Sequence, residues 1–186
     1  LVKTGAFGDM VAASSSFATA AQLFPGARIC LLTCHAYAPV VEDNPDVTEI
    51  VCLPDGHNPF RLLSCLLRLR RRRFDISVDL KGSAKTTFYT LVIGARWRTG
   101  LCEGWPTGRL LHVPVSKRVA IGPLELQERV WKALGADRLE PMRLPVSPHR
   151  AVEMNTWMEG LGLAPHRYVI LHPSASAEWE TKRWPA

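Results

Sequence analysis

A short loop with two glycines, at residues 3–10 (KTGAFGDM), constrains the fold more than any other stretch. Glycine tolerates positive φ and lets a ligand or another backbone come close, so Gly5 and Gly8 predict a sharp turn between a strand end and a helix start. Asp9 falls where the N-terminal dipole of that helix favours a carboxylate. The loop predicts that Asp9 is presented at a crevice, and a plain N-cap is the alternative role for this side chain.

The same strand–loop–helix order repeats along the chain. Helical spacing predicts helices between the strands, and residues 102–112 predict a loop. Apolar runs predict strands at residues 28–33, 48–53, 74–80 and 96–101, and the expected helices cover residues 10–24, 60–73, 84–93, 124–134 and 150–161, with a short one from about residue 36. Strands this apolar are typical of a parallel sheet covered on both faces, so the sequence predicts an α/β fold.

Three prolines between residues 137 and 148 mark a linker or crossover. We therefore predict a Rossmann-like domain over residues 1–140, a linker with a crossover helix over 141–165, and the start of a second domain over 166–186. Its first strand is expected at residues 168–172. With 186 residues and 47% hydrophobic content, the chain can bury a sizeable core but is short for two domains, so we expect it to be part of a longer protein.

Composition narrows the partners and the compartment. The net charge of +6 predicts an anionic partner, without separating nucleic acid, membrane and phosphorylated small molecules. Five cysteines form no CxxC pair, which predicts thiols in a reducing cytoplasm and no metal site. No apolar run reaches the ~20 residues of a membrane span, and no signal peptide opens the chain. The sequence predicts a soluble, cytoplasmic protein.

The helix expected at residues 60–73 combines leucines with arginines. We expect Leu62, Leu63, Leu66 and Leu67 on one face and Arg61, Arg68 and Arg72 on the opposite face. Such a helix is commonly a surface helix whose arginines are solvated. The alternative is contact with an anionic membrane surface or acceptor.

A second loop, at residues 173–185, has the pattern of a phosphate site. Small residues follow an apolar run, and a lysine and a proline come next. Backbone N–H groups at Ser174 and Ser176 would hold phosphate oxygens, and Lys182 or Arg183 would supply positive charge. An ordinary surface loop with a solvated lysine is the alternative.

Five stretches, taken in order, resemble glycosyltransferase family 9, the bacterial ADP-heptose:lipopolysaccharide heptosyltransferases. They are GAFGD, NPDV, RRFDISVDLKGS, RTGL and HPSASAEWETKRWP. The resemblance implies a GT-B architecture, in which two Rossmann-like domains face each other across a cleft. It implies metal-free, inverting transfer of a heptose from ADP-heptose to a lipopolysaccharide inner-core acceptor at the cytoplasmic face of the inner membrane. Because both domains form such a site, this stretch alone is expected to be inactive.

The resemblance also assigns residues. Asp9 matches the general base of the family, and Lys182 matches the lysine near the donor diphosphate. Gly5 and Gly8 match the loop that shapes the cleft. Ser174 is a departure, because the family usually has glycine there.

Three further residues complete the expected site. Glu125 stands near the start of a helix where the family often has a histidine. Lys81 and Arg98, expected near the carboxyl ends of their strands, could meet anionic groups of the acceptor. The alternative for Lys81 and Arg98 is a solvated surface.

Two other functions compete with glycosyl transfer. A non-catalytic Rossmann-like module could hold a nucleotide, RNA or membrane phosphate through the arginines at residues 68–73. Leucines flank these arginines where stacking aromatics would favour nucleic acid, so no nucleic-acid partner is expected. A nicotinamide-dependent oxidoreductase would need a complete GxGxxG motif and an acidic partner, which the sequence lacks.

Overall fold

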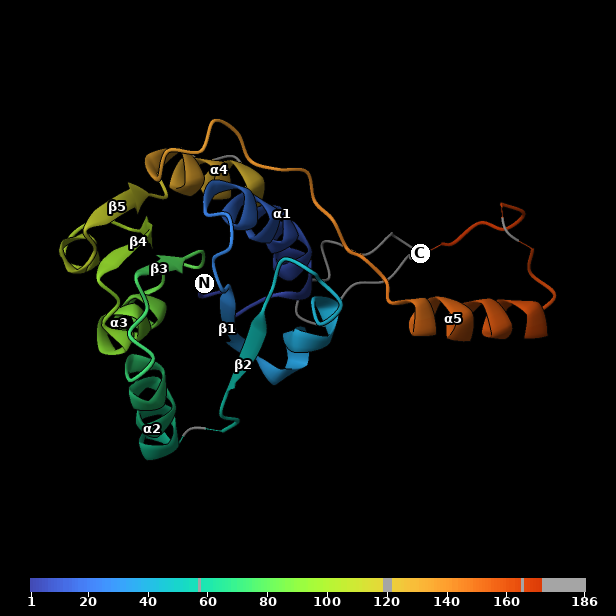
Figure 1. Ribbon diagram of the computed structural model, residues 1–186, viewed down its shortest axis with the longest axis horizontal. Helices are drawn as coiled ribbons and strands as arrows, with labels where there is room; N and C mark the ends of the chain where they lie inside the picture. Colours follow the sequence, from blue (N-terminus) through green and yellow to red (C-terminus); the bar gives the residue numbers. More distant parts are fainter. Residues whose placement is uncertain (57, 119–121, 165, 172–186) are drawn as a thin grey trace, which may run out of the picture. The chain divides into compact units, whose positions relative to one another are not determined.

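The chain forms an α/β structure in this computed structural model, which describes residues 1–56, 58–118, 122–164 and 166–171. It divides into two compact units, Leu1–Pro145 and Val146–Ala186. The first unit contains parallel strands with helices packed on both faces, which confirms the predicted fold class (Figure 1). The finer division into residues 1–140, 141–165 and 166–186 stays a prediction.

Residues 1–3 join two sets of parallel strands. The strands are β1 (Cys30–Cys34), β2 (Glu49–Leu53), β3 (Ile76–Asp79), β4 (Trp97–Cys102) and β5 (Val113–Ser116). β1 pairs with β2, and β4 lies between β3 and β5. Val2 bridges Leu32 of β1 on one side and Asp79 of β3 on the other. The resulting order is β2, β1, residues 1–3, β3, β4, β5, which is the doubly wound Rossmann order with its switch point beside residues 1–3.

The helices cover both faces of these strands. They are α1 (Phe7–Leu23), α2 (Pro59–Arg70), α3 (Ala84–Ile93) and α4 (Pro123–Ala133), with 3₁₀ turns η1 (His35–Val40) and η2 (Thr107–Leu110). On one face, Met10 and Phe17 of α1 pack against Leu31, and all three are fully buried. On the other face, Leu32 packs with Leu66 of α2 and with residues of α3. Adjacent residues of β1 thus face opposite layers, as the two-residue period of a strand requires.

α1 and α4 are joined by a buried polar contact. The Ser16 hydroxyl donates to Oε1 of Gln127 at 2.5 Å and accepts a hydrogen bond from Nε1 of Trp131 at 2.8 Å. Both α4 side chains of this contact, Gln127 and Trp131, are buried. The contact fixes α4 over α1 at the end of the first unit.

The sequence missed one strand. Residues 102–112 were expected to form a loop, and the structure adds the 3₁₀ turn η2 within them and the strand β5 directly after them. β5 has four residues and contains Pro114. Proline lacks the N–H group that a central strand donates to its neighbours, so it is confined to strands such as β5 at the edge of a sheet. A four-residue strand that contains proline has too short an apolar run to be recognised in the sequence.

The predicted faces of α2 are partly wrong. Leu62 and Leu66 pack inward as expected, but Leu63 and Leu67 are each 44% exposed, and Phe60 is 82% exposed. Leu63 and Leu67, with the neighbouring Phe60, therefore lie on the outer side of the helix. The inward face is formed by the buried Cys65, Leu66 and Leu69, with Leu62 partly buried beside them.

The second unit contains α5 (Pro148–Gly160). The strand expected at residues 168–172 does not form over residues 168–171, and residue 172 lies outside the described part of the chain. A strand is stabilised by pairing, and the described residues of this unit include no other strand for it to join. None of the described helices is both long and apolar enough to cross a membrane.

Candidate functional site

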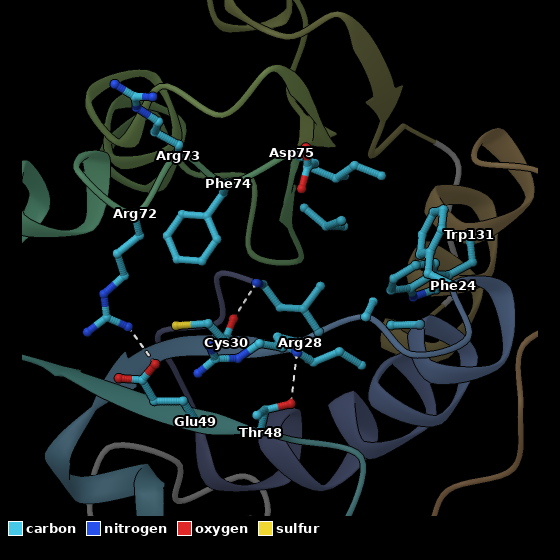
Figure 2. Close-up of a pocket in the computed structure, with 16 residues that line it drawn as sticks. Phe24, Arg28, Cys30, Thr48, Glu49, Arg72, Arg73, Phe74, Asp75 and Trp131 are labelled. Carbon is cyan, nitrogen blue, oxygen red and sulfur yellow. Dashed lines mark hydrogen bonds and ion pairs between the residues drawn. The ribbon is translucent and has the colours of Figure 1, made fainter.

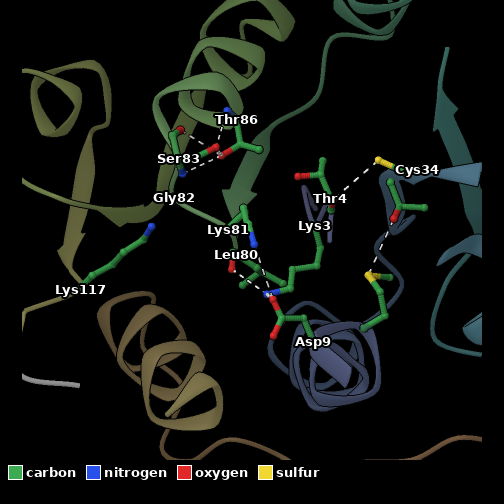
Figure 3. A network of polar contacts seen from close by, with 12 residues as sticks. Lys3, Thr4, Asp9, Cys34, Leu80, Lys81, Gly82, Ser83, Thr86 and Lys117 are labelled. Carbon is green, nitrogen blue, oxygen red and sulfur yellow. Dashed lines mark hydrogen bonds and ion pairs between the residues drawn. The ribbon is translucent and has the colours of Figure 1, made fainter. Parts of the chain in front are cut away.

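Two loops meet at the switch point of the sheet, and Asp9 lies between them. One loop follows residues 1–3, and the other follows β3. Oδ2 of Asp9 lies 3.4 Å from Nζ of Lys3 and 3.7 Å from Nζ of Lys81 (Figure 3). The fold thus brings together Asp9 and Lys81, two of the residues that the sequence singled out. Ligands of open α/β sheets bind at this edge, beyond the carboxyl ends of the strands.

Asp9 lies inside the first turn of α1 and does not cap it. The N-cap is Ala6, and it makes no side-chain capping hydrogen bond. The carboxylate of Asp9 gains from the N-terminal dipole of α1 while its side chain stays 32% exposed. The alternative of a plain N-cap is therefore wrong, and the carboxylate remains accessible to a substrate.

The two glycines of the first loop do not use positive φ. Gly5 and Gly8 are absent from the glycines with positive φ, and Gly8 lies within α1 in open space. A β-carbon on Gly5 would lie 3.9 Å from Nζ of Lys81 and from a ring carbon of Tyr37, which is ordinary contact. A β-carbon at residue 5 would therefore fit, and the prediction that Gly5 and Gly8 use positive φ to make a sharp turn is wrong.

The second loop is built on Asp79, the last residue of β3. Its Oδ1 accepts hydrogen bonds from the backbone N–H groups of Lys81 and Gly82, each at 2.9 Å. Asp79 is fully buried, and its Oδ2 has no hydrogen-bond partner among the described residues. Burial raises the pKa of the Asp79 carboxyl, and the two backbone hydrogen bonds oppose that rise. Asp79 thus sets the turn that carries Lys81.

The side chain of Lys3 connects the first turn of α1 to the loop after β3. Its side chain is buried, and Nζ donates to the carbonyl oxygen of Leu80 at 3.3 Å as well as approaching Asp9. Burial lowers the pKa of Lys3, while the charge of Asp9 acts in the opposite direction. The ammonium group therefore holds an acidic side chain and the neighbouring loop at once.

The remaining candidates lie elsewhere. Arg98 is near the start of β4, not its carboxyl end, and binds the carbonyl oxygens of Leu110 and Ala95. It supports the turn η2 and does not reach the site edge. Glu125 pairs with Arg129 one turn along α4. Ser174, Ser176 and Lys182 lie outside the described residues.

A hollow of about 940 Å³ lies at the opposite edge of the sheet (Figure 2). It opens beside the amino ends of β1 and β3, where Cys30 and Ile76 line it. Arg72 and Glu49 form an ion pair on its wall. Because ligands of such sheets bind at the carboxyl ends of the strands, we do not place the site here.

Metal-binding side chains do not cluster in the described part of the chain. No group of three or more His, Cys, Asp or Glu side chains there could hold a metal ion. The five cysteines are free; Cys65 and Cys102 are buried, and the other three are half-buried. The expectation of a metal-free reaction stays a prediction.

Sequence reasoning gave no role to Lys3 or Asp79. Both are charged residues at the end of an apolar strand, next to a glycine-containing loop. Charged residues at that position are costly to bury and lie at the ligand-binding edge, so their placement was a usable signal. Residues 1–3 are too few to be recognised as a strand in the sequence, so this signal was missed for Lys3.

Comparison with known proteins gave matches among solved structures only. No protein-family description and no curated protein sequence matches the chain. A glycosyltransferase of family 9 from Veillonella parvula matches with a TM-score of 0.75 and 16% identity, covering 89% of this chain and 49% of that one. The E. coli ADP-heptose lipopolysaccharide heptosyltransferase II matches with a TM-score of 0.62 and 21% identity, covering 89% and 51%.

A third match is an E. coli heptosyltransferase solved with ADP, at a TM-score of 0.62 and 15% identity, covering 76% of this chain and 48% of that one. The chain spans about half the length of the structures it matches. At these identities the likeness concerns the fold. The chain has the α/β, GT-B type fold found in glycosyltransferase family 9 and in ADP-heptose:lipopolysaccharide heptosyltransferases.

Proposed function

We propose that the protein carrying this chain is an inverting glycosyltransferase that moves a heptose or related sugar from a nucleotide-diphosphate sugar to a lipopolysaccharide-type acceptor, with ADP-heptose as the expected donor. The observation that carries the proposal is the accessible carboxylate of Asp9 at the switch point, held beside Lys3 and Lys81. The fold shared with heptosyltransferases supports the same reaction class. This chain would supply the acceptor side of the cleft.

In the proposed step, Asp9 accepts the proton of an acceptor hydroxyl as that oxygen attacks the anomeric carbon. A new carbon–oxygen bond forms, the bond from the anomeric carbon to the phosphate oxygen breaks, and ADP leaves with the electron pair. Lys81 lies close enough to Asp9 to meet a negative group of the acceptor beside the reacting hydroxyl. The sugar is transferred with inversion because the attack comes from the face opposite the leaving group.

The donor side of the proposal rests on residues 173–185. Backbone N–H groups at Ser174 and Ser176 and the charge of Lys182 would stabilise the negative charge of the leaving diphosphate. Each such donor is typically worth about 3 kcal/mol of transition-state stabilisation. We propose that no metal takes part, because these groups can carry the charge themselves.

The exposed side of α2 supports contact with a lipid-bearing acceptor. Phe60, Leu63 and Leu67 are exposed there, and Arg61 and Arg68 are exposed on the same helix. Exposed apolar side chains beside arginines are typical of a helix that lies at an anionic membrane surface. We propose that the protein works in the cytoplasm, at the inner-membrane surface. Arg72 is not included among the membrane-contacting arginines, because it pairs with Glu49.

The direct test is to supply the whole protein with ADP-heptose and a lipopolysaccharide inner-core acceptor and to follow both products. We expect ADP to be released in step with a mass increase of the acceptor by one heptose. Release of ADP without glycosylated acceptor, or neither product across several nucleotide sugars and acceptors, would contradict the proposal.

A further inference from the structure

The ammonium group of Lys3 is an unusual buried charge. Its side chain is buried at the end of residues 1–3, where the backbone N–H of Lys3 donates to the carbonyl oxygen of Leu32 at 3.0 Å. An ionised amine is costly to bury unless charged and polar groups surround it. Among the described residues, Lys3 meets this requirement with two oxygens, from Asp9 and Leu80. Asp9 stands in the first turn of α1, and Leu80 lies in the loop after β3.

Lys3 and Lys81 approach the same oxygen of Asp9. Both ammonium nitrogens lie within ion-pair distance of Oδ2, and among the described residues no hydrogen bond or ion pair is made to Oδ1. Lys81 is more than one-third exposed and can swing away, whereas the buried Lys3 is confined. The fixed contact on Oδ2 thus comes from Lys3.

We propose that Lys3 is a positioning residue, which anchors Oδ2 of Asp9 so that Oδ1 is the oxygen that meets the acceptor hydroxyl. The inference rests on the proposed role of Asp9. Lys3 does not touch the substrate, and its effect passes through the carboxylate and through the Leu80 carbonyl. The hydrogen bond from Lys3 to the Leu80 carbonyl oxygen also fixes the position of the loop that carries Lys81 relative to α1.

The charged and titratable groups around this carboxylate come from several elements. Lys3 ends the first strand, Lys81 follows β3, and Asp79 lies beneath Lys81. Cys34 ends β1, where its thiol donates to the carbonyl oxygen of Thr4 at 3.6 Å. Of these groups, only the two lysines contact Asp9 with opposite charge, so removing Lys3 leaves the more mobile cation alone.

A purely structural role for Lys3 gives a different expectation. If Lys3 only ties the loops together, its replacement lowers stability, but the surviving folded protein turns over normally. If Lys3 orients the base, turnover falls even where the protein is folded. The two cases separate in kcat and KM, but not in the melting temperature alone.

The variants are Lys3→Met, which removes the charge, and Lys3→Gln, which keeps a donor for both oxygens. The matched control is Lys85→Met, an exposed lysine in the first turn of α3 at the same edge of the sheet. All are made in the whole protein and measured with ADP-heptose and an inner-core acceptor. Lys3→Gln keeps the test decisive if Lys3→Met fails to fold.

We expect Lys3→Met to lower kcat by about 10- to 100-fold with KM changed by no more than about twofold, because a misplaced catalytic group costs up to about 10²-fold. Lys3→Gln should recover part of kcat. Lys85→Met should change neither quantity.

Unchanged kcat in folded Lys3→Met, or in folded Lys3→Gln where Lys3→Met does not fold, would overturn the inference. That result is separable from failure of the proposed function, because Asp9→Asn is measured beside them. If Asp9→Asn retains transfer, the base assignment fails and the positioning role fails with it. If Asp9→Asn loses transfer while the Lys3 variants keep it, only the positioning role is lost.

Discussion

Gly100 of β4 lies directly against the backbone of Asp79 in β3. A β-carbon at residue 100 would come within 2.5 Å of the Asp79 carbonyl oxygen and 2.6 Å of its Cβ. The φ of Gly100 is +152°, a value that other residues rarely adopt. Because Asp79 sets the turn that carries Lys81, the close approach of β3 and β4 also shapes the candidate site.

Gly100→Ala should therefore destabilise the fold. Overpacking of this kind costs about 1–3 kcal/mol in the free energy of unfolding. Denaturant unfolding measures it, with Gly8→Ala as the control, because a β-carbon there meets open space within a helix and should stabilise by no more than about 1 kcal/mol. If Gly100→Ala were as stable as the wild type, β3 and β4 could accommodate the added β-carbon, and the contact would not require glycine at residue 100.

Asp79→Asn tests the buried carboxylate through the pH dependence of stability. Burial raises the pKa of Asp79 above its ordinary value of 3.8, so the folded state holds this proton more tightly than the unfolded state does. Stability from this group is therefore present below pH 3.8 and is lost as the pH rises through the raised pKa. The asparagine amide oxygen can still accept from Lys81 and Gly82 but never ionises.

We expect the stability of Asp79→Asn relative to wild type to increase from acidic to neutral pH. Urea unfolding at a series of pH values gives the difference directly. A difference that is constant with pH would mean that this carboxyl titrates alike in the folded and unfolded states.

Ser16→Ala tests the contact between α1 and α4. The substitution leaves Oε1 of Gln127 and Nε1 of Trp131 buried without their partner. An unsatisfied buried group costs about 1–3 kcal/mol. Ser64→Ala, an exposed serine of α2, is the control and should stay within about 0.5 kcal/mol of wild type. If both variants unfold at the same denaturant concentration, the buried contact contributes nothing net.

The outer side of α2 can be tested with lipid vesicles. Replacing Arg61 and Arg68 with Gln should weaken binding to anionic vesicles by roughly 30-fold, since each basic residue near such a surface is worth about 1 kcal/mol. Arg72→Gln is the matched control, because Arg72 is engaged with Glu49. Equal binding to neutral and anionic vesicles, or an equal loss in the control, would argue against a membrane role.

Much of the fold follows from the sequence because parallel strands and their helices have strong local patterns. The α3 bounds, residues 84–93, were predicted correctly, since Ser83 supplies a capping box and Gly94 a left-handed end. β5 was missed because Pro114 and a four-residue length leave no apolar run. The strand predicted at residues 168–172 does not form over residues 168–171. An apolar run indicates a segment that can be buried in a sheet, but a strand forms only beside a partner strand.

The site shows the same division. Asp9 and Lys81 could be singled out because glycine loops and strand ends mark the binding edge of such a sheet. Their 3.7 Å approach depends on strand order, since β3 comes to lie beside residues 1–3 rather than beside β2. Local patterns do not contain that order. The same long-range pairing hides the role of Lys3, whose partners come from α1 and from the loop after β3.

The measurement that tests the central claim most directly is turnover by Asp9→Asn in the whole protein, alongside Asp9→Ala and thermal melting. Asparagine keeps the shape and polarity of the side chain and removes the proton acceptor, so transfer should fall by about 10²–10⁴-fold. Because Asp9 does not cap α1, the lost dipole stabilisation should cost no more than about 1 kcal/mol in either variant. Both variants also leave the buried Lys3 without its charged partner, so we expect both to melt below wild type. A folded Asp9→Asn enzyme that retains most of its heptose transfer would contradict the account.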